Sequence, residues 1–121
     1  MTWSIIARDD ITGQIGIAVA TKFFAVGARV PHIAAGFGGI ATQALVNPYY
    51  GIDGVRLLRE GQSPQNIVKT LIARDGGRES RQLHIMDASG RISAHTGSEC
   101  VDWCGHIEGD GFSISSWRVV R

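Results

Sequence analysis

Threonine at position 2 is the first residue of this chain whose type and place could do chemistry, because it directly precedes a β-like run in "MTWSIIARDD". Initiator methionine is readily removed before a small residue, so the mature chain can begin at Thr2 with an α-amine and a hydroxyl on one residue. Such an amine has a pKa of about 8, so a fraction of the chains carries it as a neutral base at pH 7. That base can take the proton from Oγ as Oγ attacks a carbonyl. Thr2 is therefore a candidate nucleophile for amide hydrolysis, although threonine is also common in strands and after an initiator methionine. Ser4 is a weaker rival because it has no free amine.

Three residues further along could assist such a reaction. The cation of Lys22 can lower the pKa of the Thr2 amine by like-charge repulsion, although an exposed lysine at a strand end is the simpler explanation. Gln43 and Asn47 lie in "ATQALVN", and their amides can donate to an oxyanion or hold a substrate amide. Asn47 also precedes a proline at a predicted helix start, so we favour a capping role for it. The role of Gln43 stays open.

A second cluster of polar side chains is expected at the junction between the second predicted helix and the strand that follows it. His95 and Thr96 lie in "AHTG", where His95 is a candidate for a base or a substrate contact. The alternative for His95 is a bond to backbone at a strand end. Arg81 is a candidate carboxylate-binding residue, and the alternative is an Arg81–Asp75 pair that fixes the junction.

The cysteines invite a metal interpretation that the spacing does not favour. Cys100, Cys104 and His106 form C-x3-C-x-H, which supplies three of the four ligands that zinc needs. His95 could complete the set, but the spacing matches no usual zinc knuckle or ribbon. We therefore expect no metal and no cofactor, with the two cysteines as thiols in a reducing compartment. The glycine-rich "GFGG" is not a phosphate-binding fingerprint and more simply permits close packing of strands.

Apolar periodicity predicts the elements that must position these residues. Alternating or β-branched runs predict strands over 2–7, 14–21, 23–30, 32–35 and 37–42. Helix starts at Asn47-Pro48 and Ser63-Pro64 then predict two helices, the first of which ends at Gly61. Strands return over 81–87 and 91–95. This order predicts a single α+β domain over 1–121 with mainly antiparallel sheets.

Charge and hydropathy argue against two classes of partner, nucleic acids and membranes. The chain has 121 residues with a formal net charge of +1 at pH 7, which argues against a polyanionic partner such as nucleic acid. No apolar run approaches the roughly 20 residues needed to cross a bilayer. The start also lacks the basic and hydrophobic regions of a signal peptide. We therefore expect no nucleic acid, no membrane and a cytoplasmic location.

Long stretches of the sequence resemble one family. "TWSIIARDDITGQIGIAVATKFFAVGA", "AAGFGGIATQA", "YYGIDGVRLLREGQSPQNIVKTLIARD", "RESRQLHIMDASGRISAHTG" and "WCGHIEG" are similar to the domain-of-unknown-function 1028 family. The resemblance implies an N-terminal-nucleophile (Ntn) hydrolase fold, a four-layer αββα sandwich. It implies Thr2 as the nucleophile but no settled substrate. The chemistry of Thr2 predicts a small-molecule or peptide-like amide substrate. In proteasome-type members of that superfamily an acid and a lysine assist, and these positions fall near Ala20 and Arg29. Alanine cannot act as the acid.

The resemblance covers about Thr2 to Gly111, and the segment 113–121 is set apart as an atypical tail. One hypothesis is that the chain is truncated, or its reading frame shifted, after about Phe112. The sandwich would then be incomplete at its C-terminus, and an open sheet favours a homo-oligomer. The alternative to the hydrolase is a catalytically silent binding or structural module on the same fold.

Overall fold

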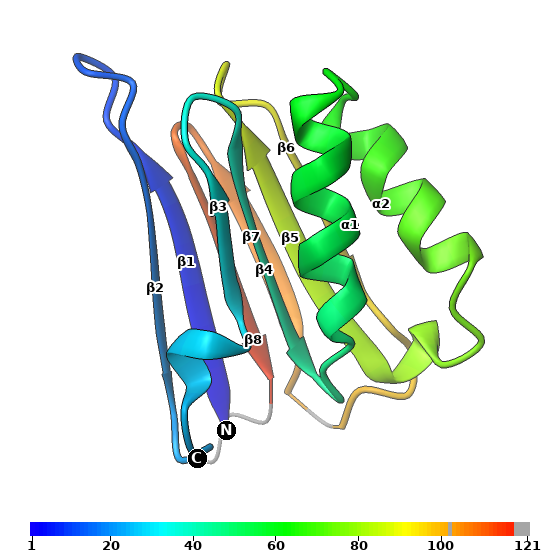
Figure 1. Ribbon diagram of the computed structural model, residues 1–121. Helices are drawn as coiled ribbons and strands as arrows, with labels where there is room; N and C mark the ends of the chain where they lie inside the picture. The colour runs from blue at the N-terminus through cyan, green and yellow to red at the C-terminus, as the bar shows by residue number, and fades with distance from the viewer. Residues whose placement is uncertain (102, 118–121) are drawn as a thin grey trace.

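Two four-stranded antiparallel sheets form the centre of the protein, whose computed structural model describes residues 1–101 and 103–117 (Figure 1). Sheet A has the order β2-β1-β8-β7 and sheet B has the order β3-β4-β5-β6. The strands of sheet A are β1 (Thr2–Arg8), β2 (Ile15–Thr21), β7 (Gly105–Gly109) and β8 (Phe112–Trp117). Those of sheet B are β3 (Pro31–Ala34), β4 (Gly38–Ala44), β5 (Arg81–Asp87) and β6 (Ile92–Thr96).

The two predicted helices, α1 (Pro48–Arg59) and α2 (Pro64–Ala73), pack on the face of sheet B that points away from sheet A (Figure 1). Both predicted caps are present: Asn47 Oδ1 accepts the Tyr49 N–H at 3.1 Å, and Ser63 Oγ accepts the Asn66 N–H at 3.3 Å. Gly61 follows α1 with φ of 79°, the left-handed conformation that glycine adopts at a helix end. At 12 and 10 residues, neither of these α-helices of the described chain reaches the length of a membrane span.

Alternation along β5 separates two cores. Leu83 and Ile85 face the helices and join an apolar cluster with Ile40. Met86 faces sheet A and packs with Ile6 in a second cluster. The described chain is therefore an α+β arrangement of three layers, with helices on sheet B and sheet B on sheet A. Between the sheets only part of the interface is apolar, and the rest is polar.

The structure differs from the predicted elements at two places. Segment 23–30 is not a strand but a loop with a short 3₁₀ helix, η1 (Val26–Ala28). Ala25 lies in the left-handed region at φ 57°, which breaks an extended run, and Phe24 is 92% exposed. Strands β7 and β8 were not predicted. Residues 113–117 of the segment set apart as atypical form most of β8, which lies between β1 and β7, and residues 118–121 lie outside the described part.

Candidate functional site

Thr2 begins β1 and lies between two strands, opposite Thr21 of β2 and Trp117 of β8. Its Oγ1 donates to Thr21 Oγ1 at 2.9 Å, and Thr21 Oγ1 donates to the Met1 carbonyl at 2.9 Å. Thr2 is 7% exposed, whereas Met1 is 54% exposed. Thr2 does not line any of three cavities of the described chain, of about 410, 290 and 210 Å³. With Met1 in place, the Thr2 hydroxyl is therefore held by Thr21 and is not presented to any of these three cavities.

The two predicted cations, Lys22 and Arg29, are exposed on the segment that follows β2. Lys22 follows Thr21, the strand partner of Thr2, so it lies beside the start of β1. Arg29 lies over the ring of Phe23, 5.5 Å from its centroid. Neither cation is a hydrogen-bond partner of Thr2.

Gln43 and Thr96 belong to a chain of hydrogen bonds that runs between the sheets. Ser4 Oγ donates to Gln43 Oε1 at 2.8 Å, and Gln43 Nε2 donates to Gln82 Oε1 at 2.6 Å. Gln82 Nε2 lies 3.0 Å from Thr96 Oγ1 and donates to the carbonyls of Gly105 and Ser116 at 2.9 and 3.1 Å. Gln43, Gln82 and Ser4 are fully buried. The Gln43 amide is thus committed to this chain.

Two backbone carbonyls fix the direction of every bond in that chain. A carbonyl oxygen only accepts, so the amide nitrogen of Gln82 must face Gly105 and Ser116, and its oxygen must face Gln43. The oxygen of Gln43 then faces Ser4, which must donate its single proton there. Ser4 therefore has no proton left for a second acceptor. This arrangement is not that of a nucleophilic serine.

His84 continues the chain from Ser4 to β8. Its Nε2 lies 2.8 Å from Ser4 Oγ, and its Nδ1 lies 2.9 Å from Ser113 Oγ. Because the Ser4 proton is given to Gln43, Nε2 carries the histidine proton and Nδ1 accepts from Ser113. Burial lowers the pKa of His84 to about 3, with a smaller contribution from His106, so the ring stays neutral at pH 7. His84 joins the two sheets as a neutral hydrogen-bonding group.

Asn47 and Arg81 meet at Asp75, below the start of α1. The Asn47 amide and Arg81 Nε each donate to Asp75 Oδ2 at 3.1 Å, and the Gly77 N–H donates to Asp75 Oδ1 at 2.8 Å. Burial raises the pKa of the Asp75 carboxyl, but these hydrogen bonds outweigh it and hold that pKa well below its ordinary value. Arg81 also donates to the Leu45 carbonyl. Arg81 therefore fixes the junction between helix and strand, and Asn47 caps α1.

His95 and the cysteines bond to backbone. His95 Nε2 donates to the Arg78 carbonyl at 3.0 Å, and Thr96 Oγ1 lies 3.0 Å from His106 Nδ1. Both cysteines are free; Cys104 Sγ lies 3.6 Å from the Cys100 carbonyl. Within residues 1–101 and 103–117, no three His, Cys, Asp or Glu side chains are grouped as metal ligands would be.

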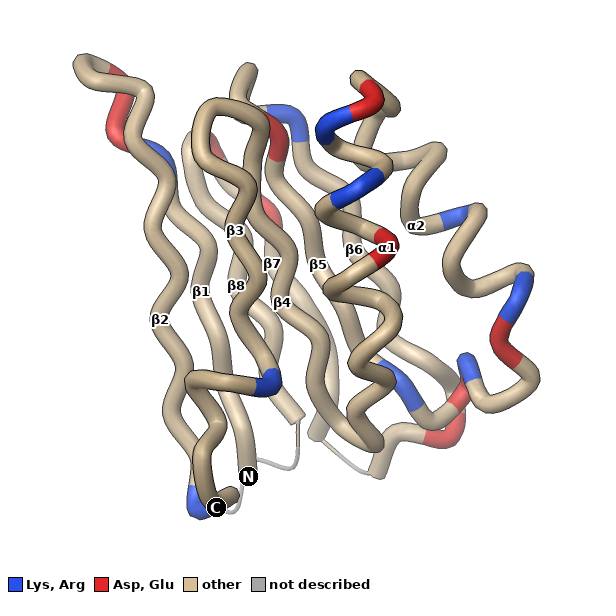
Figure 2. Tube along the Cα trace, in the orientation of Figure 1, with Lys and Arg blue, Asp and Glu red and all other residues tan. Residues whose placement is uncertain are grey.

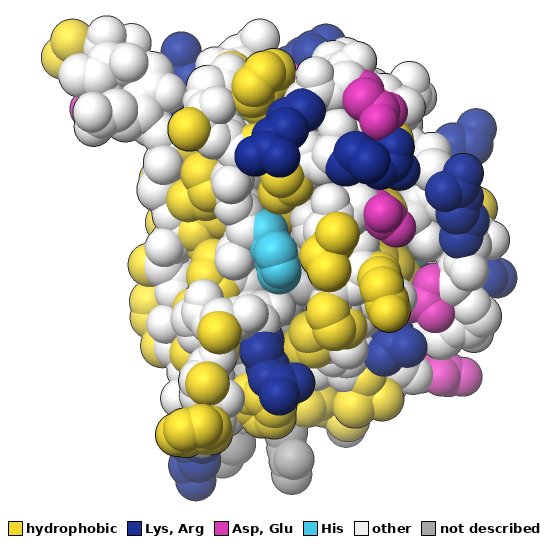
Figure 3. Space-filling model, viewed as in Figure 1, with side chains coloured by type: hydrophobic (Ala, Val, Ile, Leu, Met, Phe, Trp, Pro, Cys, Tyr) yellow, Lys and Arg dark blue, Asp and Glu magenta, His cyan; other side chains and the backbone are white. Residues whose placement is uncertain are grey.

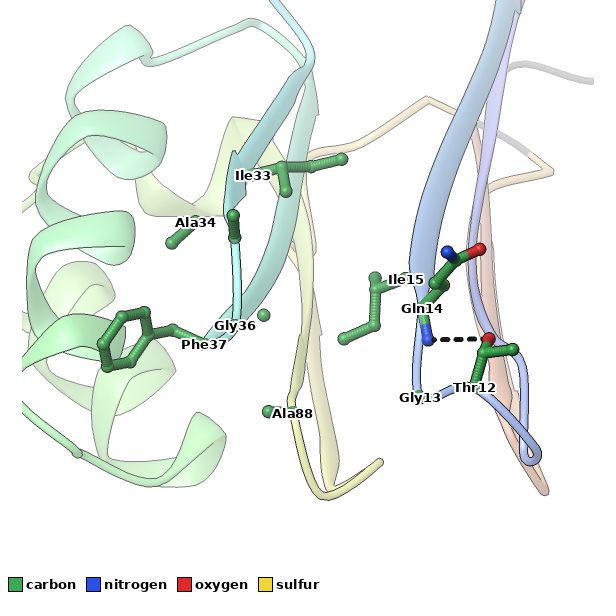
Figure 4. A pocket seen from close by; sticks show the side chains of 11 residues that line it. Thr12, Gly13, Gln14, Ile15, Ile33, Ala34, Gly36, Phe37 and Ala88 are labelled. Carbon is green, nitrogen blue, oxygen red and sulfur yellow. Dashed lines mark hydrogen bonds between the residues drawn. The ribbon is translucent and has the colours of Figure 1, made fainter.

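A cleft of about 410 Å³ lies at the opposite end of the sandwich from Thr2, between the β1–β2 and β3–β4 turns (Figure 4). Ile15 points into the space between these turns, and Gln14 N–H donates to Thr12 Oγ1 at 3.3 Å. No charged side chain is among the residues that line it. The cleft suits a small uncharged ligand.

Sequence analysis did not predict the internal polar network on the inner face of β5. In "RQLHIMD" the apolar run suggests a buried strand, and Gln82 and His84 occupy alternate positions of it. Two polar residues that share one face of a buried strand are the signal of an internal polar network. Ser113 could not be found this way, because its strand was not predicted.

The comparisons with known proteins agree on one family. A family model described as a family of unknown function, DUF1028, matches residues 2–117. The crystal structure of protein SPO2555 from Silicibacter pomeroyi, described by the same family model, is similar at 36% sequence identity and a TM-score of 0.90. The match covers 94% of this chain and 53% of that chain, so this chain spans about half the length of that protein. No curated protein matches it.

Proposed function

The chain belongs to the DUF1028 family, and from this premise we propose that it is an N-terminal-nucleophile amidohydrolase in which Thr2 is the nucleophile after removal of Met1. Its substrate would be a small-molecule or peptide-like amide. The fold would be that of the Ntn hydrolases, and the location the cytoplasm, with which two free cysteines are compatible. Two packed antiparallel sheets with a helix layer, and Thr2 at the start of an inner strand, support this fold.

One observation carries the proposal: the Thr21 hydroxyl lies 2.9 Å from both Thr2 Oγ1 and the Met1 carbonyl oxygen. Removal of Met1 takes away that carbonyl and leaves an α-amine on Thr2. Thr21 is then free to accept from this amine while it still holds the Thr2 hydroxyl. Met1 is more than half exposed, so an aminopeptidase can reach it.

The proposed reaction needs no cofactor. The neutral amine, directly or through a water, takes the proton of Oγ1 as that oxygen attacks the amide carbon. The amine of the substrate leaves with a proton, and an ester remains on Thr2. Water attacks this ester with the same amine as base, which releases the acid and restores the hydroxyl. The cation of Lys22, one residue beyond Thr21, would help to keep the Thr2 amine neutral.

The test is covalent capture by a β-lactone or a peptidyl boronate. Mass spectrometry first shows whether Met1 is removed, and peptide mapping then finds the modified residue. We expect an adduct on Thr2 of the processed chain, its loss in Thr2→Ala, and its retention in Thr12→Ala, which removes a threonine hydroxyl at the far end. Retention of Met1, or an adduct that survives Thr2→Ala, contradicts the proposal.

The second candidate is a catalytically silent binding module, and the cleft at the other end of the sandwich favours it. That cleft is within the size range of ligand pockets, whereas Thr2 is covered. A processed chain that forms no adduct with several reagents would favour this reading. An uncharged ligand that shifts the NMR signals of Gln14 and Ile15 would then locate the site.

A further inference from the structure

A cavity of about 210 Å³ lies where the start of α1 meets the end of α2. The two helices run in opposite directions on sheet B, so the N-terminus of α1 and the C-terminus of α2 share one end of the pair (Figure 1). Tyr49, Tyr50 and Asp53 line the cavity from α1. Leu71 and Arg74 line it from α2 and the residue that follows it. The cavity therefore joins aromatic, apolar and charged side chains in a small space.

The end of α2 provides the cation of this cavity. Figure 3 views the molecule onto the helices, where side chains of both charge signs lie. In the tube of Figure 2, a basic and then an acidic residue follow α2, at Arg74 and Asp75. Asp75 is committed to the junction between helix and strand, where three donors bond it. Arg74 is exposed, and no ion pair joins it to another residue within 1–101 and 103–117. Its guanidinium can therefore bind a ligand anion.

Asp53 provides the anion. Its Oδ1 lies 3.9 Å from Arg56 Nε, which is beyond hydrogen-bond distance. Arg56 instead bonds Glu60 at 2.6 Å, one turn further along α1. The Asp53 side chain is 43% exposed, so a ligand in the cavity can reach it. The Asp53 carboxylate can therefore accept hydrogen bonds from a ligand cation.

Tyr50 brings a buried hydroxyl to the same cavity. The residue is 2% exposed, and its hydroxyl makes no hydrogen bond of good geometry with the part of the chain that the structure describes. Burial raises the pKa of this phenol well above its ordinary value, and the nearby Asp75 carboxylate adds to the effect. The phenol therefore keeps its proton at pH 7. A buried hydroxyl of this kind is stabilised by an acceptor, which a ligand carboxylate supplies.

We propose that this cavity binds a small free α-amino acid as a zwitterion, with its ammonium group at Asp53 and its carboxylate at Arg74 and the Tyr50 hydroxyl. The cavity has the room of about seven water molecules, which suits a ligand with about that many non-hydrogen atoms, such as alanine or valine. Leu71 is buried at its wall and offers an apolar contact for a short side chain. Thr2 does not line this cavity, so amino-acid binding here does not depend on the proposed hydrolysis.

Calorimetric titration of the 121-residue chain with L-alanine and L-valine tests this proposal, and NMR locates the site. We expect binding that moves the signals of Tyr50 and Leu71. N-acetylalanine lacks the ammonium group and alaninamide lacks the carboxylate. Each should bind at least about tenfold more weakly than alanine, because each loses a charge-assisted hydrogen bond.

Variants test the same contacts from the side of the protein. Asp53→Asn and Arg74→Gln should each weaken alanine binding by about tenfold, since each removes one charge from the site. Tyr50→Phe removes only the buried hydroxyl and should weaken binding by a smaller factor. Arg59→Gln is the matched control, because it removes a cation at the other end of α1 and should leave binding unchanged. Circular dichroism checks that each variant folds, and the two analogues test the unaltered chain where one does not.

The proposal is overturned if the folded chain binds neither amino acid, or binds the two analogues as tightly as alanine. It is also overturned if Asp53→Asn or Arg74→Gln binds alanine as the wild type does, or if Arg59→Gln weakens binding as much. NMR shifts confined to Gln14 and Ile15 would place the ligand in the cleft at the other end and contradict it. Covalent capture at Thr2 reports on a different site, so the two proposals fail separately.

Discussion

At the scale of single residues, the interior hydrogen-bond chain decides what each polar group can do. Gln43 is a natural oxyanion donor by type, but its amide bonds Ser4 and Gln82. Ser4 has a histidine at hydrogen-bond distance, but its proton points the other way. The Thr2 hydroxyl donates to another hydroxyl, that of Thr21, and lies outside this chain of hydrogen bonds.

His84 makes stability depend on pH. In the unfolded chain a histidine binds a proton below about pH 6.5, whereas burial keeps folded His84 neutral down to about pH 3. The unfolded state therefore binds more protons between these values, so the free energy of unfolding falls as pH decreases. From pH 7 to pH 4.5 we expect a loss of about 2–3 kcal/mol from this residue, measured by urea unfolding.

His84→Gln should unfold more easily at pH 7, by about 1–3 kcal/mol, because Ser4 or Ser113 loses a partner. It should also lose the His84 part of the pH dependence. His95→Gln, which removes a histidine at a strand end, is the control and should keep that part. An equal slope with pH in the wild type and in His84→Gln would show that His84 is not the group responsible.

At the scale of elements, local signals located the helices well. The pairs Asn47-Pro48 and Ser63-Pro64 each predict a helix start, and both caps are present in the structure. The strand over 81–87 was predicted to the residue. The run 23–30 misled because Ala25 adopts the left-handed conformation, which breaks an extended run and which the local apolar pattern does not reveal. Strands β7 and β8 are short and rich in glycine and serine, so their signal is weak.

The two caps differ in what they hold. Ser63 accepts one backbone N–H, whereas Asn47 accepts one and also donates to Asp75. We expect Ser63→Ala to lower the free energy of unfolding by about 1 kcal/mol. Asn47→Ala should lower it by about 2 kcal/mol, since Asp75 loses a donor as well. Equal losses in urea unfolding would show that the Asn47–Asp75 bond contributes nothing.

The candidate site was predictable only in part. Thr2 and the Asp75–Arg81 pair follow from residue type and position, and the structure brings Asn47 to that pair. The Ser4–His84–Ser113 connection joins β1, β5 and β8, which are far apart in the sequence. Only the packing of one sheet on the other makes it. No periodicity within one segment contains that information.

At the scale of the whole molecule, the two faces of sheet A differ in their side chains. The inner face holds the polar chain that fixes sheet A on sheet B, and the outer face is apolar and charge-free. The match covers 53% of the relative from Silicibacter pomeroyi, so nearly half of that chain has no counterpart among the residues matched here.

The central claim is that the hydroxyl and the amine of Thr2 act together, and α-amine blockade tests it most directly. The processed chain is compared with the same chain acetylated on the Thr2 amine, which keeps the hydroxyl in place. The account predicts that the free-amine chain forms the β-lactone adduct at a rate that rises with pH toward about 8, and that the acetylated chain does not react. Equal adduct formation by both chains, or none by either, would contradict it.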